Sequence, residues 1–352
     1  MPPLVSIVTP VHQGADTLSE CLDSILSQTY QNWECAIVDN CSTDGSTEIA
    51  RRYAREDSRL RVCRSETFRR AIANHNFALK QISPDSKYCK VVFADDRIFP
   101  ESIEKMVAVA EAHPSVGLVG GYWLEGERLM GTRLPRTSDC VSGRDICRSH
   151  FLDRVYVFGS ANAVLYRADL VRRHEPFYNQ ANIHADTEVC FELLKHCDFG
   201  FVHDVLSFSR VRRGSLSTIS ADLNTELPGT LHILLTHGRD YLTDAEYRIR
   251  LDRHLTDYYE FLGKSLFCRR DKRFWEYHMC QLDRVGFSRS RLLKAIVTQM
   301  GRAGLNPKQS LEKLLARRNS HETDAPSSPV GDRHPLTNDD RPPWERQIRS
   351  NG

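Results

Sequence analysis

The sequence predicts an α/β protein: a mostly parallel sheet flanked by helices, followed by a C-terminal helical appendage. Three observations predict it. Roughly the first 120 residues alternate short apolar runs with stretches whose apolar residues recur every three or four positions. The apolar runs are continuous, which is typical of strands buried on both faces of a parallel sheet. Beyond residue 221 only helical patterns remain.

The elements of the first part follow from their residues in order. The runs expected to form strands are Val5–Val11, Cys35–Val38, Leu60–Cys63, Val91–Ala94 and Val116–Val119. The first helix between them is predicted from apolar residues at helical spacing, Leu18, Cys21, Leu22, Ile25 and Leu26. Thr17 and Glu20 have the spacing of a capping box at its start. Pro100 suits the first turn of a later helix.

We expect three parts along the chain. Residues 1–220 hold these elements and a second set, in which Tyr156–Gly159 and Ala163–Tyr166 are strand-like. Residues 221–318 form the helical C-terminal region. Pro, Ser, Asp, Asn and Arg dominate residues 319–352, which predicts a disordered tail.

Composition excludes several classes of protein. The formal net charge of +2 favours no polyanionic partner, so nucleic-acid binding is not expected. Eleven cysteines, an odd number without a C-x-x-C pair, argue against a disulfide framework and for a reducing cytoplasm. No apolar run is long enough for a transmembrane helix, and Leu4–Val8 is interpreted as part of the first strand rather than a signal peptide. We therefore expect a cytoplasmic location.

Carboxylates stand at the ends of two predicted strands. Asp39 follows the second apolar run, and Asp95 and Asp96 follow Val91–Ala94. Because ligands bind at the carboxyl ends of strands in such sheets, we expect these residues at one edge. Asp39 can accept hydrogen bonds from a base or ribose, or it can simply cap the next turn. The Asp95–Asp96 pair favours a bound divalent cation, Mg²⁺ or Mn²⁺, although a solvated strand end paired with Arg97 is the alternative.

Two further segments carry candidate site residues. Asp186 lies just before an apolar helical face, so it is either a general base or an acid that favours the helix dipole. The arginine-rich run Arg210–Ser217 suits a diphosphate clamp, but it also suits a nucleic-acid contact or a solvated loop. The sequence lacks G-x-x-x-x-G-K-[ST] and G-x-G-x-x-G, which removes the common ATP and NAD interpretations.

Together these segments resemble the family 2 glycosyltransferases, which have the GT-A fold. The resemblance rests on S-I-L-S-Q-T-Y-Q-N-W-E, residues 24–34, followed by I-V-D-N-C-S-T-D-G-S, residues 37–46. Val5–Val11 precedes these runs. The match extends over roughly residues 4–218 and includes, further on, Asn74, Asn76, Asp95-Asp96, Gly159-Ser160, Arg167, Asp186, Arg210 and Ser217.

The resemblance implies an inverting enzyme that moves a sugar from a nucleotide-diphosphate sugar, typically UDP-linked, to a hydroxyl of a saccharide or lipid-linked acceptor. Asp39 would contact the base, Asp95 and Asp96 would handle the ribose and the divalent metal, and Asp186 would deprotonate the acceptor. The Arg210–Ser217 loop would close over the diphosphate. The nucleotide-sugar site would comprise Thr9, Pro10, Val11, Asp39, Asn76, Asp95 and Arg210.

Two departures from the family pattern bear on activity. Phe93 stands where the family often carries Asp, and Ala185 stands where it often carries Glu. They leave open a catalytically degenerate protein that binds nucleotide sugars. A sugar nucleotidyltransferase is another alternative, although residues 11–16 lack the Gly-rich basic loop usual in that class.

The C-terminal region is basic. Residues 269–318 carry 13 Lys and Arg against 4 Asp and Glu. The residues that share one helical face are Leu292, Leu293, Ile296, Val297 and Met300. This helix either contacts a membrane surface peripherally, which would bring the enzyme to a lipid-linked acceptor, or packs its apolar face on the protein body. We favour packing.

Overall fold

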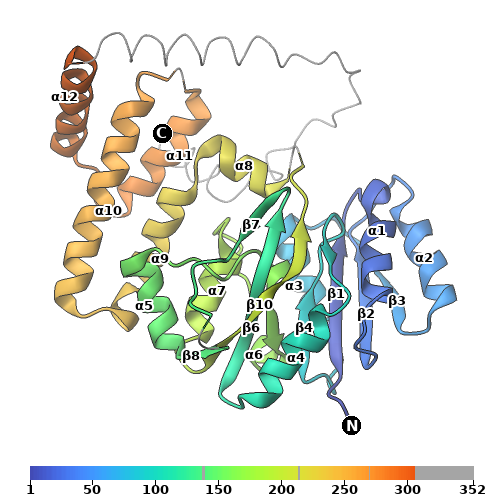
Figure 1. The fold of residues 1–352 in the computed structure, drawn as a ribbon. Helices are drawn as coiled ribbons and strands as arrows, with labels where there is room; N and C mark the ends of the chain where they lie inside the picture. The colour runs from blue at the N-terminus through green and yellow to red at the C-terminus, as the bar shows by residue number, and fades with distance from the viewer. Residues whose placement is uncertain (137–138, 213–214, 269, 306–352) are drawn as a thin grey trace. The chain divides into compact units, whose positions relative to one another are not determined.

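The computed structural model describes residues 1–136, 139–212, 215–268 and 270–305 (Figure 1). The chain divides into two compact units. The first holds Met1–Asp222 and His232–Tyr247, and the second holds Leu223–Leu231 and the described residues from Arg248 onward. Residues 232–247 thus belong to the first unit rather than to the C-terminal region. The expected boundaries otherwise stay predictions, and the tail 319–352 lies outside the described residues.

Ten strands of the described part form one sheet in the order β3-β2-β1-β4-β9-β6-β10-β5, with β7 on β6 and β8 on β10. The strands are β1 (Val5–Val11), β2 (Trp33–Asp39), β3 (Leu60–Arg64), β4 (Tyr88–Val91), β5 (Arg97–Ile98), β6 (Val116–Glu125), β7 (Arg128–Met130), β8 (Cys140–Val141), β9 (Leu165–Arg167) and β10 (Asp198–Ser209).

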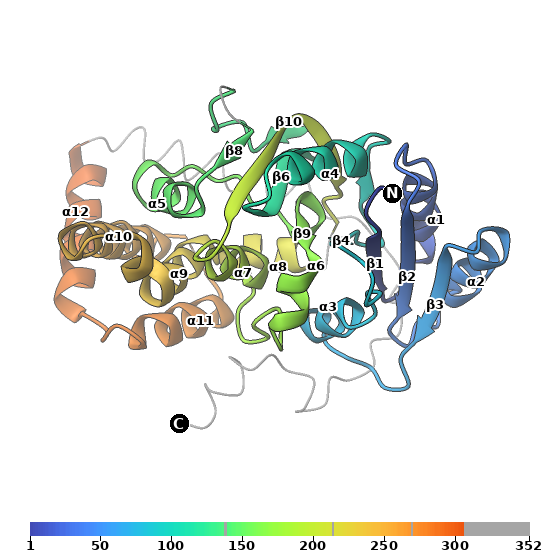
Figure 2. The same ribbon diagram turned by 90° about the horizontal axis from the view of Figure 1, so that it is seen from below.

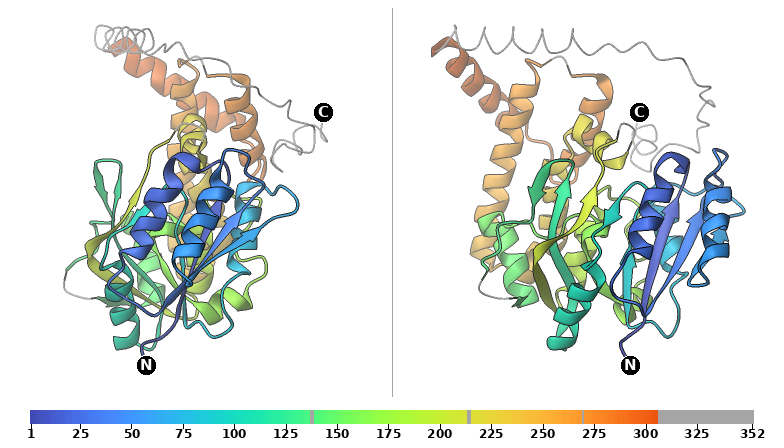
Figure 3. Two further views of the ribbon diagram at one scale, coloured as in Figure 1. Left: turned by 90° about the vertical axis from the view of Figure 1, so that its right-hand side faces the viewer. Right: turned by 45° about the vertical axis from the view of Figure 1, so that its right-hand side comes forward.

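Six of these strands run in one direction. β1 is parallel to β2 and β4, β2 is parallel to β3, and β6 is parallel to β10. β9 is antiparallel to both β4 and β6, so β4 and β6 also share a direction. We call the edge where β1, β2, β3, β4, β6 and β10 end the carboxyl edge. Figure 3 shows β1 and β2 from two sides, ending away from the N-terminus. The prediction of a mostly parallel sheet is confirmed.

Helices cover both faces of the sheet. Figure 2 shows α1 and α2 on one side of β1 and β2 and α3 on the other. The helices of the first half are α1 (Ala15–Leu26), α2 (Ser46–Glu56), α3 (Ala71–Leu79), α4 (Ser102–Ala112), α5 (Gly143–Asp153), α6 (Ala168–Arg173) and α7 (Ala185–Leu193). A 3₁₀ turn spans Ala161–Ala163. The later helices are α8 (Leu216–Leu223), α9 (Glu226–Tyr241), α10 (Asp244–Ser265), α11 (Lys272–Asp283) and α12 (Arg289–Leu305).

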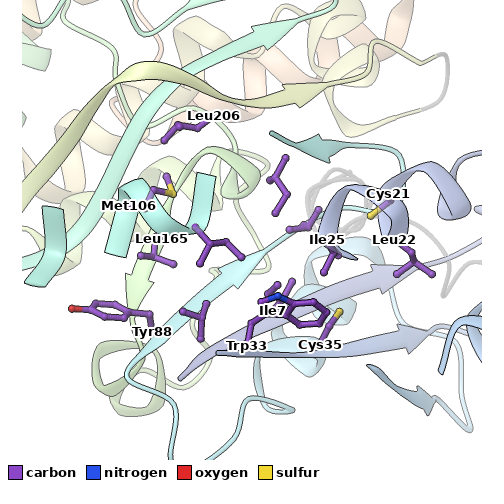
Figure 4. Close-up of a cluster of buried hydrophobic side chains, with 14 of the residues drawn as sticks. Ile7, Cys21, Leu22, Ile25, Trp33, Cys35, Tyr88, Met106, Leu165 and Leu206 are labelled. Atoms are coloured by element: carbon purple, nitrogen blue, oxygen red, sulfur yellow. The ribbon is translucent and has the colours of Figure 1, made fainter. Parts of the chain in front are cut away.

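The core of the first unit lies between α1, α4 and the sheet (Figure 4). Ile25 of α1 and Met106 of α4 are completely buried, as is Ile7 of β1. The continuous apolar run of β1 is thereby explained, because every residue of this strand is buried. This packing fixes the ends of the central strands, where the candidate site lies.

Three local predictions are wrong. The fourth strand ends at Val91 rather than Ala94, and residues 93–96 form a turn closed by the Asp96 N–H on the Phe93 carbonyl, at 2.9 Å. Tyr156–Gly159 has no strand pairing. Glu20 does not complete a capping box, because its carboxylate pairs with Arg97 and Arg210 instead.

The basic helix α12 packs through a small residue. Ala295 is buried, and a Cβ added at Gly263 of α10 would lie 3.1 Å from the Ala295 Cβ. Leu293 and Val297 remain 61% and 60% exposed, whereas Leu292 and Ile296 are half-buried, so the favoured packing of that apolar face stays a prediction. The Met300 side chain lies outside the description. None of the helices in the described ranges combines the length and apolarity needed to cross a bilayer.

Candidate active site

The turn after β4 binds the end of β10 through Asp96. The Asp96 side chain is buried, one carboxylate oxygen accepts the Arg210 N–H at 2.9 Å, and the other accepts the Ser209 hydroxyl at 3.2 Å. Burial and, to a lesser extent, the neighbouring Asp95 carboxylate raise the pKa of Asp96 to about 7, although these hydrogen bonds act in the opposite direction. Two strand ends far apart in sequence are therefore joined at the carboxyl edge.

Arginines lie against the acidic turn. Asp95 keeps 24% of its side chain exposed, and the Arg212 Nε lies 3.6 Å from one of its carboxylate oxygens. The Arg210 Nε donates to the Asp95 carbonyl at 3.2 Å, while its terminal nitrogen pairs with Glu20. The expected encounter of the basic loop with the acidic motif is therefore present, although Arg213 and Gly214 lie outside the described residues.

A divalent cation fits this turn only with help from a ligand. Within the part of the chain that the structure describes, no three His, Cys, Asp or Glu side chains gather as a potential metal site. Asp96 already accepts hydrogen bonds on both oxygens, so Asp95 offers the more available carboxylate. One carboxylate with oxygens from a phosphate ligand is a usual way to hold Mg²⁺. The metal assignment of Asp95 and Asp96 stays a prediction.

Asp39 ends β2 and caps the turn that follows. Its carboxylate accepts the Ser42 N–H at 3.2 Å and the Thr47 hydroxyl at 2.7 Å, and its side chain is only 1% exposed. Of the two interpretations left open by the sequence, the structure displays the capping role. A contact between Asp39 and a nucleotide base stays a prediction.

Three residues expected in the nucleotide-sugar site belong to β1 itself. Thr9, Pro10 and Val11 are the last residues of β1 and are buried, because they pair with β2 in the middle of the sheet. The loop itself starts at His12, whose Nδ1 lies 2.9 Å from the Asn40 carbonyl.

The His12 ring contacts an exposed aromatic side chain that the sequence did not single out. Its ring centroid lies 4.9 Å from that of Phe68, which is 55% exposed. The Asn40 side chain holds the neighbouring Arg69 backbone with two hydrogen bonds, at 2.6 and 2.8 Å. The two residues are therefore held at the carboxyl edge, and both are exposed to solvent.

Asp186 lies in the first turn of α7. Burial raises the pKa of its carboxyl group, while His184 and the Thr187 N–H, which donates to it at 2.8 Å, act in the opposite direction. The pKa values of the Tyr156 and Tyr178 hydroxyls are raised mainly by burial of these side chains, and the Asp186 charge raises them as well. Both phenols therefore lie within the electrostatic reach of Asp186. A carboxyl group in this setting can hold a proton nearer to neutral pH than an ordinary Asp.

Ring contacts connect Asp186 to the acidic turn. Phe93, the first residue of the turn, lies 4.8 Å from the His75 ring, and His75 lies 6.5 Å from the Tyr178 ring. Tyr178 in turn is close enough to feel the charge of Asp186. The structure thus brings Asp95 and Asp96 into contact with Arg210 and Arg212, and it links Asp186 to them through aromatic side chains.

Asn76 has a structural partner. Its amide donates to the Tyr178 carbonyl at 2.8 Å and accepts the Tyr178 N–H at 2.7 Å. Both ends of the amide are used, and they anchor the loop that leads to α7. The expected contact between Asn76 and a nucleotide sugar is not prepared by this arrangement and stays a prediction.

A second anchor of α7 escaped the sequence analysis. Glu188 accepts a hydrogen bond from Asn182 at 2.8 Å and is reached by Asn179, and the His232 Nε2 lies 2.9 Å from its carboxylate. Burial opposes ionisation, yet these hydrogen bonds lower the pKa of Glu188 to about 2. Glu188 stands two residues from Asp186 in sequence, but no spacing points to His232.

A mostly parallel α/β sheet with an acidic turn and attached arginines at its carboxyl edge has the architecture of the GT-A fold. Residues 6–171 match the family described as "Glycosyl transferase family 2". Over these residues the chain is similar to the family that the motifs led us to expect, and the expected GT-A fold is confirmed.

Named relatives agree with this assignment. The chain is 31% identical over 164 residues to the "Putative glycosyltransferase EpsE" of Bacillus subtilis, covering 44% of this chain and 58% of the relative. It is 33% identical over 105 residues to the "Putative teichuronic acid biosynthesis glycosyltransferase TuaG" of the same organism, covering 30% and 41%. The matches thus span about half the length of these relatives.

One longer match and one solved structure extend the comparison. "Glycosyltransferase GlyG" of Streptococcus pneumoniae is 25% identical over 233 residues, covering 64% of this chain and 76% of the relative. The fold is similar to that of S. aureus TarS 1-349 in complex with UDP-GlcNAc, with a TM-score of 0.57 at 17% identity, covering 78% of this chain and 79% of that one.

Proposed function

We propose that this chain is an inverting glycosyltransferase that moves a sugar from a nucleoside-diphosphate sugar, with uridine as the base, to a hydroxyl of a saccharide or glycolipid. The observation that carries the proposal is the junction of the acidic turn with Ser209, Arg210 and Arg212. It sets a carboxylate and two guanidinium groups side by side, as a diphosphate ligand with a cation requires. The relatives that are named glycosyltransferases support the same class.

Donor binding would use the whole carboxyl edge. The base would lie against the His12 and Phe68 rings, where an exposed aromatic face is held in place. The diphosphate would bind the guanidinium groups of Arg210 and Arg212. Asp95 would hold a divalent cation, Mg²⁺ or Mn²⁺, which when bound neutralises charge on the departing diphosphate.

The transfer itself would rest on Asp186. Its carboxylate would accept the proton of the acceptor hydroxyl while the hydroxyl oxygen forms a bond to the anomeric carbon. The bond from that carbon to the diphosphate oxygen breaks on the opposite face, so one displacement inverts the configuration. The raised pKa of Asp186 suits this role, because a base works best when its pKa approaches the working pH.

The first test is a screen of uridine, guanosine and thymidine diphosphate sugars for thermal stabilisation and turnover, followed by Asp186→Asn. The variant should retain donor binding and lose transfer by a factor of about 10² or more. Asp145→Asn is the matched control, because Asp145 also lies in the first turn of a helix but is exposed. Near-normal transfer by Asp186→Asn would remove Asp186 from the proposed role.

The second test concerns the cation. Asp95→Ala should abolish both transfer and its response to Mg²⁺ or Mn²⁺, whereas Asp85→Ala, at an exposed loop position, should not. Transfer that persists in EDTA would end the proposal of metal dependence.

Two other activities give different products. A sugar nucleotidyltransferase would release pyrophosphate, whereas glycosyl transfer releases a nucleoside diphosphate. A degenerate binding protein would be stabilised by a nucleotide sugar without any turnover. Phe93 contacts His75 and Ala185 is buried, so both departures from the family pattern take part in packing.

The outward face of α12 supports a peripheral membrane contact. Leu293 and Val297 are exposed, and so are Arg289 and Lys294 of the same helix. Apolar residues flanked by cations suit an anionic lipid surface, where a glycolipid acceptor would lie. The chain should sediment with vesicles containing phosphatidylglycerol. The double variant Leu293→Ser and Val297→Ser should sediment with them less. Ile249→Ser, at another exposed apolar position, is the control; equal sedimentation of all variants would contradict the contact.

A further inference from the structure

Tyr156 carries an exposed ring whose hydroxyl is fixed from within. The hydroxyl donates to the Gly159 carbonyl at 3.0 Å and lies 3.4 Å from the Thr187 hydroxyl. The residue nevertheless remains 36% exposed. A tyrosine that points its hydroxyl inward leaves the ring as the part that meets the solvent. The ring is therefore surface that the fold holds in one place.

The ring is braced by a buried tryptophan. Trp123 of β6 packs edge-on against Tyr156 with a centroid distance of 6.0 Å. Gly159 has a φ of +64°, and a Cβ there would lie 2.6 Å from the Ala163 Cβ and 3.3 Å from the Trp123 ring. Only glycine permits this close turn, which supplies the carbonyl that binds the Tyr156 hydroxyl. The segment is thus built to hold an aromatic face rigidly.

Tyr156 interacts with residues next to both parts of the proposed site. Thr187, which touches the Tyr156 hydroxyl, is the residue after Asp186. Burial raises the pKa of the Tyr156 hydroxyl, and the charge of Glu125, at the end of β6, raises it as well. The next residue, Gly126, donates its N–H to the Ser209 carbonyl at 3.1 Å, and Ser209 binds Asp96. The exposed ring therefore stands beside the proposed base and near the acidic turn.

We propose that Tyr156 is the platform on which the acceptor sugar stacks, so that the acceptor is a pyranose with an apolar C–H face. An aromatic face gives a large contact at low conformational cost, and neighbouring carboxylates such as Glu125 can accept sugar hydroxyls. The inference deepens the proposed function and rests on it. It adds a contact that selects a saccharide over a small non-sugar alcohol.

The experiment separates sugar binding from turnover. Saturation-transfer NMR would measure binding of methyl glycosides of glucose, galactose, mannose and N-acetylglucosamine, with UDP and Mg²⁺ present, to wild type, Tyr156→Phe and Tyr156→Leu. Wild type and Tyr156→Phe should bind at least one glycoside alike. Tyr156→Leu should weaken that binding about tenfold, whereas Phe99→Leu, which changes an exposed aromatic elsewhere, should not.

Turnover supplies the second measurement. With any active donor, Tyr156→Leu should raise the acceptor KM about tenfold, whereas Tyr156→Phe should leave it close to that of wild type. Absence of glycoside binding to wild type, or equal binding by Tyr156→Leu, would overturn the platform. Absence of all turnover with intact glycoside binding would instead contradict the glycosyltransferase proposal and leave the aromatic sugar site supported.

Discussion

Replacing Asp96 by Asn should stabilise the protein at pH 8. The change keeps the shape of the side chain. Its oxygen can still accept the Arg210 N–H, and its amide can donate to the Ser209 hydroxyl, which accepts as readily as it donates. What the substitution removes is a negative charge that burial and Asp95 both disfavour.

The magnitude follows from the pKa. Asp96 titrates at about 7 in the folded chain against an ordinary value of 3.8. Between these values the folded state binds more protons than the unfolded state, so the free energy of unfolding falls as the pH rises. At about 1.4 kcal/mol for each pH unit, the ionised carboxylate costs the folded chain up to about 4 kcal/mol at pH 8. Asp96→Asn avoids this cost.

Urea unfolding at pH 5, 6, 7 and 8 in EDTA would measure how much the ionised Asp96 carboxylate destabilises the folded chain. The quantity to compare is the free energy of unfolding of Asp96→Asn minus that of wild type, because the titration of other groups cancels in this difference. The difference should grow with pH and level off above pH 7, where Asp96 is ionised in wild type. Asp145→Asn, at an exposed site, should follow wild type. A variant that is less stable at pH 8, or a difference that does not change with pH, would refute the reasoning.

Four further outcomes are expected. Glu188→Ala should lower the free energy of unfolding by about 2–3 kcal/mol in urea titrations, because Asn182 and His232 lose their acceptor; Glu192→Ala, at an exposed site, is the control. Glu20→Ala should cost less than about 1 kcal/mol, because its ion pairs are solvated; a larger loss would show a buried network. Gly159→Ala should lower the melting temperature clearly more than Gly45→Ala, which meets no neighbour. Transfer should fall on acidification at a higher pH than for an ordinary Asp, because the pKa of Asp186 is raised and only its ionised form accepts the proton; an acid limb near pH 4 would contradict this.

The fold and part of the site could be predicted because local patterns determine them. Continuous apolar runs are typical of strands inside a parallel sheet, and residues directly after such strands lie at the carboxyl edge. Asp95, Asp96 and Asp39 were found in this way. The strand end was missed by three residues because Val92, Phe93 and Ala94 are apolar although the strand ends at Val91.

The remaining partners could not be predicted because they depend on distant contacts. Glu20 has the spacing of a helix cap, and only the fold reveals that it meets Arg210. His12 and Phe68 lie on different loops, and each alone is an ordinary surface residue. Asn76 matches a motif position, yet its amide binds the backbone of Tyr178. Which of several available partners a polar side chain takes is decided by packing, not by spacing.

The arginines on the acidic turn have a consequence for the order of binding. Arg210 and Arg212 already neutralise the carboxylates of Glu20 and Asp95, so a cation arriving alone must displace a guanidinium group. A diphosphate arriving alone must draw the same groups away and leave carboxylates uncompensated. When both arrive together, each takes the charge that the other releases. The proposed donor and cation should therefore bind cooperatively, and each should raise the affinity for the other by the same factor.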